Sequence, residues 1–309
     1  MNYNALQFPF KAEQGPNCKT LPQAILKGVP SAENAKNALK QVLDGDLCTL
    51  DLHDQSLRAA LEGGPGHVVL SAPVNWTDDQ LRWAYASVLQ QLGELNDRYG
   101  RMFDVVDRGL DHTTSNAPVS KTKAATGMHT DSSDAMYNPD LVALLCLQPG
   151  SQGGASLLAN AMELLERLRD VAPHLESVAR APWARDVVTP GLASSRAAIK
   201  ANTIPIFSDD ARGPVFRYMR YWTERALTKI GRAIPSELTA LFNFIDTDME
   251  QHALRFQLKR GDILIANNRT VVHGREAFED LPNAAPRHLV RAWVDGFLKP
   301  VETRLSKRA

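Results

Sequence analysis

Two stretches of this chain carry apolar residues on both faces of an expected strand, and they limit the folds that it can adopt. Leu141–Leu147 is apolar throughout, which is typical of a strand that is buried on both sides. Arg287–Val294 also places large apolar residues on both of its alternating faces. A sheet that contains such strands needs other layers above and below it. The sequence therefore predicts a layered fold with an internal sheet.

Many other short strands are expected, with helices near the N-terminus and in the middle of the chain. Strands are expected at His67–Leu70, Met102–Val106, Ala155–Leu158, Val187–Val188, Thr203–Phe207 and Val215–Met219. Leu254–Leu258 and Ile263–Ala266 flank a turn at Lys259–Asp262 and are expected to form a hairpin. Helices are expected from Ser31 to about Leu43, after a capping box at Thr77 and Gln80, and at Ala161–Arg169, Leu175–Ala179, Trp222–Ile230 and Pro235–Gln251. The pattern is mainly β with α, and it indicates a β-sandwich or jelly roll decorated with helices.

Composition excludes several classes of protein. The 309 residues contain 35 Lys and Arg against 35 Asp and Glu, so no nucleic acid or anionic membrane is expected as a partner. Three widely spaced cysteines argue against a disulfide framework and for a reducing, cytoplasmic location. The N-terminus has neither the basic start nor the long apolar stretch of a signal peptide. No apolar run approaches the roughly 20 residues of a membrane span.

The tripeptide His129-Thr130-Asp131 has the spacing of a metal site. On an extended strand, residues i and i+2 share one face, so the imidazole and the carboxylate would point the same way. His273 lies beyond a strand and before a glycine, and it could complete a 2-His-1-carboxylate triad that leaves three positions open on a ferrous ion. The same three residues also suit zinc.

Two arginines form a second pattern. Arg287 and Arg291 fall on one face of the last strand, together with Leu289 and Trp293. Buried arginines keep their charge and need anionic partners. Protein carboxylates could serve, and so could small-molecule carboxylates, because the guanidinium fork matches their geometry. The two Cα atoms would lie roughly 13 Å apart in a strand, which suits two separate anions better than one.

Together these segments resemble one enzyme family, the TauD/TfdA and clavaminate-synthase-like Fe(II)/2-oxoglutarate dioxygenases. The matching pieces are HTDSS (129–133), PDLVALLCLQPGSQGGASLLANA (139–161), FRYMRYW (216–222), GDILIANNRTVVHGREAFED (261–280) and RHLVRAW (287–293). The resemblance covers roughly residues 65–298. It implies a double-stranded β-helix (jelly roll) core with N-terminal helices and a helical insert. The whole chain, 1–309, would be one domain, with a looser part at 1–60 and a lid-like insert at 160–252.

The resemblance also implies roles for individual residues. His129, Asp131 and His273 would hold Fe(II). Arg287 and Ser156 would bind the distal carboxylate of 2-oxoglutarate, the co-substrate used with O₂. The implied substrate contacts are Arg291, Met128, Ser132, Ser133 and Arg220. For Arg220 and the nearby Arg217, a solvated face is the slightly favoured interpretation.

The activity that this implies is hydroxylation of an unactivated C–H bond in a small carboxylate-bearing molecule, such as an amino acid or a natural-product intermediate. Desaturation, epoxidation or cyclisation by the same cofactors is the alternative. A zinc-type hydrolase or a non-catalytic metal-binding protein is a third hypothesis. Several amino-acid hydroxylases of the clavaminate branch carry Glu at the position of Asp131, so the subgroup stays open. Halogenating relatives carry a small residue there to admit halide, so the presence of Asp131 favours oxygen transfer. The oligomeric state stays open, with a homo-oligomer allowed.

Overall fold

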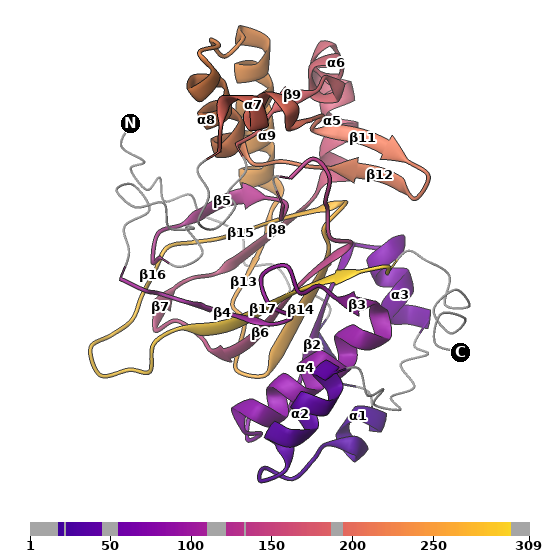
Figure 1. Ribbon diagram of the computed structural model, residues 1–309, viewed down its shortest axis with the longest axis vertical. Coiled ribbons are helices and arrows are strands. Elements are labelled where there is room, and N and C mark those ends of the chain that lie inside the picture. The colour runs from indigo at the N-terminus through magenta and orange to yellow at the C-terminus, as the bar shows by residue number, and fades with distance from the viewer. Residues whose placement is uncertain are drawn as a thin grey trace.

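Two β-sheets lie face to face at the centre of the molecule (Figure 1). The computed structural model describes residues 18–21, 23–44, 55–109, 122–132, 134–186 and 194–297. The larger sheet contains, in spatial order, β1 (Cys18–Thr20), β2 (His67–Ser71), β14 (Asp262–Asn267), β6 (Leu141–Gln148), β17 (His288–Asp295) and β3 (Glu94–Leu95), and β4 (Phe103–Val106) also pairs with β17. The smaller sheet contains β13 (Leu254–Phe256), β8 (Ser156–Asn160), β15 (Val271–Arg275) and β5 (Thr126–His129).

Strand alternation sorts the side chains of both sheets into an inner and an outer set. In β14, Leu264 packs between the sheets, whereas Ile263 and Ile265 pack on the outer side. In the smaller sheet, Val271 faces inward and Val272 faces outward. The strands are apolar on both faces because both faces are covered. This confirms the prediction of buried strands at Leu141–Leu147 and Arg287–Val294.

Helices cover the outer faces of both sheets, so the molecule has four layers (Figure 1). The larger sheet is covered by α1 (Gln23–Gly28), α2 (Ala35–Asp44), α3 (Gln55–Glu62) and α4 (Asp78–Leu92). The smaller sheet is covered by the insert, which contains α5 (Ala161–Val171), α6 (His174–Arg180), β9 (Trp183–Ala184), α7 (Arg196–Ala201), β10 (Thr203–Ile204), β11 (Phe207–Asp210), β12 (Gly213–Phe216), α8 (Arg220–Ile230) and α9 (Ser236–His252). The short strands β7 (Gln152–Gly153) and β16 (Phe278–Glu279) pair with each other.

Most of the expected elements are present, and the capping box at the start of α4 is confirmed by reciprocal hydrogen bonds between Thr77 and Gln80. The helix expected from Ser31 begins only at Ala35, because residues 32–34 form a turn first. The expected strand Thr203–Phe207 is interrupted at Pro205 and continues as β11. The strand expected at Val187–Val188 lies outside the described residues.

The expected hairpin around Lys259–Asp262 was wrong. β13 pairs with β8 in the smaller sheet, whereas β14 lies between β2 and β6 in the larger one. The turn therefore carries the chain from one sheet to the other, as the strand crossings of a jelly roll do. Each of the two strands finds its hydrogen-bond partners in a different layer.

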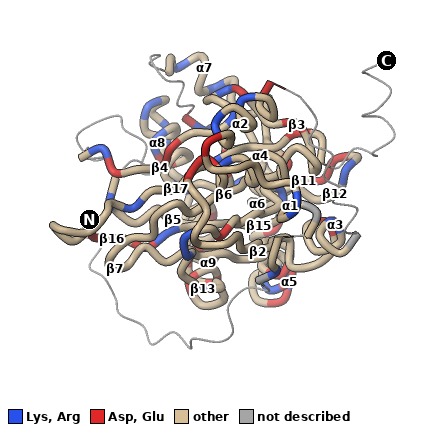
Figure 2. The backbone as a smooth tube through the Cα atoms, turned by 90° about the horizontal axis from the view of Figure 1, so that it is seen from below, with Lys and Arg blue, Asp and Glu red and all other residues tan. Residues whose placement is uncertain are grey.

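Acidic and basic residues are distributed over the same elements of the molecule (Figure 2). Many of them pair locally, for example Arg255 with Glu276 and Arg167 with Asp248. None of the helices in the described ranges is both long enough and apolar enough to cross a lipid bilayer.

The turn that precedes β8 gives a test of the fold. Gly153 has φ +67°, and a Cβ atom there would lie 2.4 Å from the carbonyl oxygen of Ala277. Gly109 has φ +65° with nothing within 4 Å of such a Cβ, so it serves as the control for backbone strain alone. We expect Gly109→Ala to cost roughly 1–2 kcal/mol and Gly153→Ala to cost more, as measured by urea unfolding. Equal losses would contradict the close approach of β7 to β16.

Candidate metal centre

Strand pairing brings the two proposed histidine ligands together. β5 and β15 are antiparallel neighbours, and His129 lies directly opposite His273. Both face the space between the sheets, because the adjacent Met128 and Val272 pack on the outer side. Their ring centroids are 4.4 Å apart. A spacing of 144 residues in sequence thus becomes a direct cross-strand pair.

Asp131 completes the cluster. Its Oδ1 lies 3.6 Å from Nε2 of His129 and 3.6 Å from Nε2 of His273. One ligand atom from each residue lies within 4.8 Å of the others. Metal–ligand bonds to such atoms are about 2.0–2.2 Å long, so one cation could contact all three. The donor set therefore fits a 2-His-1-carboxylate centre.

The tautomer of His129 and the low pKa of His273 both suit metal coordination. Nδ1 of His129 lies 2.7 Å from the carbonyl oxygen of Gly127. A carbonyl can only accept, so Nδ1 carries the hydrogen and Nε2 keeps its lone pair towards Asp131. Burial and the neighbouring His129 lower the pKa of His273, which favours the neutral form that binds metals.

The two carboxylate oxygens of Asp131 have different partners. Trp293 donates its indole N–H to Oδ2 at 2.6 Å, and Oδ1 is left facing the two imidazoles, with Nη1 of Arg291 at 3.2 Å. Burial alone would raise the pKa of Asp131, but the charge of Arg291 and the two histidines hold it well below its usual value. The carboxylate is therefore ionised, and its rotation is fixed by the indole.

Two pairs of hydrogen bonds hold the backbone around Asp131. Asn268, which is completely buried, accepts from the amide of Asp131 and donates to its carbonyl oxygen. The amide of Thr130 donates to the carbonyl of Tyr218, and the Thr130 hydroxyl accepts from the Tyr218 amide. The insert and the β14–β15 turn thus both position the ligand segment.

Arg287 and Ser156 lie on facing sheets. Ser156 is 5% exposed and shares the inward face of β8 with Leu158. Arg287 is 6% exposed, and its guanidinium lies 5.0 Å from the centre of the Phe278 ring. Among the described residues no carboxylate pairs with this guanidinium; Asp280 accepts only from the Arg287 amide. Burial lowers the pKa of Arg287 to about 10.

The residues predicted to contact the substrate do not all lie at the metal cluster. Met128 packs against the apolar cluster of the insert, on the face of β5 opposite His129. Arg220 is paired with Glu224 and Asp246. Ser132 has φ +73° and donates its hydroxyl hydrogen to the Tyr137 carbonyl. Ser133 lies outside the described residues. Arg291, by contrast, lies beside the metal cluster, with Nη1 3.2 Å from Oδ1 of Asp131.

Sequence reasoning missed the role of Trp293. Its position on the same strand face as Arg291 was available from alternation, but no pattern indicates that an indole N–H reaches a carboxylate 162 residues away. The bonds of Asn268 to the backbone of Asp131 also join residues 137 positions apart. Both depend on distances across the sandwich rather than on local spacing.

Comparison with known sequences points to one family. The profile described as "Taurine catabolism dioxygenase TauD, TfdA family" matches residues 37–293. Dioxygenase str8 of Strobilurus tenacellus is 25% identical over 61% of this chain and 42% of the relative. A uridine-5'-phosphate dioxygenase of Streptomyces sp is 29% identical over 60% of this chain and 65% of the relative. The chain therefore spans less than two thirds of the length of either relative.

Solved structures share the fold. Asparagine oxygenase in complex with Fe(II), 2S,3S-3-hydroxyasparagine and succinate superposes with a TM-score of 0.61 at 18% identity, covering 90% of this chain and 93% of that one. The non-heme iron oxygenase OrfP in complex with Fe and alpha-ketoglutaric acid gives 0.63 at 15% identity, covering 94% and 97%. At identities this low, the similarity shows a shared fold and nothing more.

The indole bond to Asp131 leads to a prediction about metal affinity. We expect Trp293→Phe to weaken binding of Co(II), a spectroscopic substitute for Fe(II), by about 10–100-fold, because the carboxylate loses the group that fixes its rotation. Calorimetric titration measures the affinity, and the visible bands of Co(II) report the ligand geometry. Trp183→Phe is the matched control, since its indole donates to a backbone carbonyl of Val178 away from the cluster. Equal affinities of the two variants would show that the Trp293 bond does not orient a ligand.

Proposed function

Since the chain belongs to the TauD/TfdA dioxygenase family, we propose that it is an Fe(II)- and 2-oxoglutarate-dependent dioxygenase. The observation that carries the proposal is the cluster of His129, Asp131 and His273 on the inner side of the sandwich. Three ligands on one side of a cation leave the other positions open for co-substrate and O₂. The reaction would be oxidation of an unactivated C–H bond in a small molecule.

The three clustered residues would hold the iron. When bound, it would couple O₂ activation to decarboxylation of 2-oxoglutarate, giving succinate and CO₂. The protein's own contribution is orientation. Trp293 fixes Asp131, Gly127 fixes the tautomer of His129, and the covered sheets exclude water from the space between them.

Arg287 and Ser156 would bind the distal carboxylate of 2-oxoglutarate. A buried guanidinium without a carboxylate partner is costly, and an incoming carboxylate would satisfy it in the bidentate geometry that arginine favours. Ser156 would add a hydroxyl donor from the opposite sheet. Two neighbouring arginines already have acceptors: Arg255 pairs with Glu276, and the buried Arg275 donates to the carbonyls of Thr122 and Ala124.

The substrate would be a small molecule with an acidic group. Arg291 lies beside Oδ1 of Asp131 and over the Phe103 ring, where it could contact a substrate carboxylate next to the iron. The names of the relatives support amino acids and natural-product intermediates as substrate classes: asparagine oxygenase, OrfP with hydroxyarginine, and uridine-5'-phosphate dioxygenase. We favour hydroxylation, with desaturation, epoxidation or cyclisation as the alternative, and a gain of one oxygen in product mass distinguishes it.

Two of the expected substrate contacts, Arg220 and Met128, now have less support. Arg220 already has two carboxylate partners, and Met128 faces the insert rather than the imidazoles. Arg291, with the loop that begins at Ser132, remains the preferred substrate surface. We also propose a reducing, cytoplasmic setting, in which the buried thiol of Cys146 stays free.

A zinc-type hydrolase would use the same three ligands but would give Arg287 no role. The two functions separate in one experiment. We expect the anaerobic, Fe(II)-loaded protein to bind 2-oxoglutarate in a calorimetric titration, and the complete system with O₂ to release succinate when screened with amino acids and related acids. Binding of Zn(II) without any binding of 2-oxoglutarate would reject the dioxygenase.

The anion role of Arg287 gives a further prediction. We expect Arg287→Met to weaken 2-oxoglutarate binding by at least 10-fold, because truncating a buried charged contact costs about 2–5 kcal/mol. Arg255→Met, which removes an exposed arginine paired with Glu276, should bind 2-oxoglutarate as the wild type does. Co(II) affinity should be unchanged in both variants. If Arg287→Met binds 2-oxoglutarate as tightly as the wild type does, Arg287 is not the residue that holds its distal carboxylate.

A further inference from the structure

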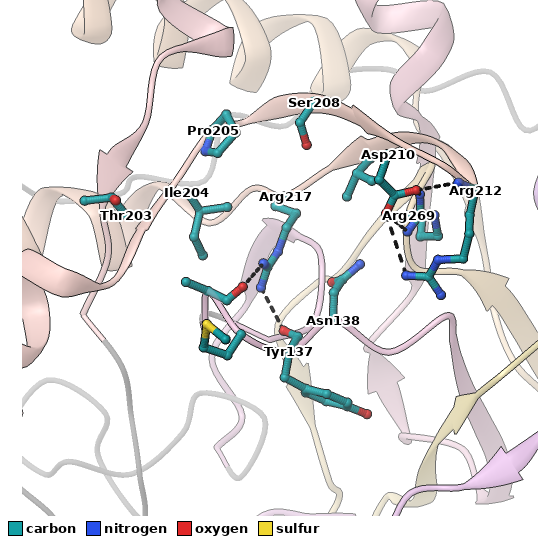
Figure 3. Close-up of a pocket in the computed structure, with 13 residues that line it drawn as sticks. Tyr137, Asn138, Thr203, Ile204, Pro205, Ser208, Asp210, Arg212, Arg217 and Arg269 are labelled. Atoms are coloured by element: carbon teal, nitrogen blue, oxygen red, sulfur yellow. Dashed lines mark hydrogen bonds and ion pairs between the residues drawn. The ribbon is translucent and has the colours of Figure 1, made fainter.

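The loop that follows Asp131 has little packing of its own. Its described residues, Ser132 and 134–138, form no helix or strand, and none of them is buried. Met136 is 92% exposed. A hollow of about 430 Å³ lies between residues 135–138 and the insert strands β10, β11 and β12 (Figure 3). Apolar contact therefore contributes little to holding this loop, although the loop leads directly from a proposed metal ligand.

One arginine of the insert gathers the carbonyl oxygens of this loop. Arg217 donates through Nη2 to the carbonyls of Asp134 at 2.6 Å and Tyr137 at 2.9 Å. Longer contacts join the same guanidinium to the carbonyls of Ser132 at 3.4 Å and Ala135 at 3.5 Å. Figure 3 shows the side chain of Arg217 pointing from the insert towards Tyr137. The main chain of one short loop is thus arranged around one cation.

The chemistry and the placement of Arg217 suit this role. The residue is 6% exposed, and burial lowers its pKa to about 10, so it stays protonated at neutral pH. Carbonyl groups outside helices and strands need donors from elsewhere, and a guanidinium presents five N–H donors in a fixed fork. The Arg217 amide donates to the Ile206 carbonyl, and the Arg217 carbonyl accepts from Arg185. The loop is therefore tied to the main chain of the insert.

Ser132 connects these contacts to Asp131. It has φ +73°, the only positive φ of a non-glycine residue in the described part of the chain, and this conformation costs free energy in an L residue. Its hydroxyl donates to the Tyr137 carbonyl, and its own carbonyl contacts Arg217. The peptide before it carries the Asp131 carbonyl, which accepts from Asn268. A relaxed backbone at Ser132 would therefore shift the peptide that positions Asp131.

We propose that Arg217 is a positioning residue for Asp131, because it holds the following loop in the conformation that aims the carboxylate at the two histidines. Arg98 and Asn202 also hold the loop, but through one carboxylate and one amide rather than through its carbonyl groups. The inference rests on the proposed function, since the direction of this carboxylate matters where it binds a metal ion. The insert would then help to determine the metal affinity of the site.

The test compares Co(II) affinity, measured by calorimetric titration, and the visible bands of bound Co(II), below the unfolding temperature of every variant. We expect Arg217→Met to weaken Co(II) binding by about 10–100-fold and to change the bands, because Asp131 loses its fixed direction. Arg217→Lys should weaken binding less, since an ammonium keeps the charge but not the fork.

The matched control is Arg260→Met. Arg260 also donates to backbone carbonyls, and none of them belongs to the loop or to the metal cluster; they are those of Val74, Leu147 and Trp76. This variant should have a lower thermal midpoint than the wild type, because those carbonyls lose their donor, and it should keep the Co(II) affinity and the bands.

Two outcomes overturn the proposal. One is an affinity and a spectrum of Arg217→Met that match those of the wild type, because Arg217 would then stabilise the loop without orienting the carboxylate. The other is equal weakening in Arg217→Met and Arg260→Met, because a general loss of stability would explain both. If Arg217→Met does not fold, Arg217→Lys decides, and wild-type affinity and bands in that variant overturn the proposal. Failure of the wild type to bind 2-oxoglutarate would reject the dioxygenase and leave the Co(II) comparison unaffected.

Discussion

The carboxylate of Asp131 is the interaction on which the site depends. It is buried between two sheets, and burial by itself would protonate it. Residues of three different elements nevertheless hold its pKa low: Arg291 of β17 and the histidines of β5 and β15. Trp293 of β17 donates to its second oxygen. β5 and β15 belong to the smaller sheet and β17 to the larger one. The contacts of Asp131 therefore depend on how the two sheets pack against each other.

The buried arginines divide into two groups, and the division carries functional information. Arg269 is neutralised by a carboxylate and stabilises the β11–β12 hairpin against the β14–β15 turn. Arg185, Arg217, Arg275 and Arg287 are comparably buried and lack such a partner among the described residues. The first three donate to backbone carbonyl oxygens instead. Among the described residues the guanidinium of Arg287 has no such acceptor, which distinguishes it as the group that an incoming carboxylate would satisfy.

Local periodicity was sufficient for part of this structure. Alternation along Leu141–Leu147 and Arg287–Val294 predicted strands buried on both faces, and the i, i+2 spacing of His129 and Asp131 predicted a shared face. Periodicity does not say which sheet a strand joins, so the supposed hairpin at Lys259–Asp262 was a crossing between sheets. It also does not identify partners distant in sequence, so the bond from Trp293 to Asp131 could not be foreseen. The orientation of Met128 was available from alternation, since it neighbours His129 and must point the other way.

Charge balance links the anion binding expected at Arg287 with that expected at Arg291. A ferrous ion held by one carboxylate carries one net positive charge, and Arg287 adds another. The 2-oxoglutarate dianion would neutralise both, so the co-substrate leaves no surplus at the metal. Arg291 would then share Oδ1 of Asp131 with the metal and retain its own charge, which a substrate acidic group could balance. In a low-dielectric interior this remaining charge favours a substrate that brings an acidic group to Arg291 over a neutral one.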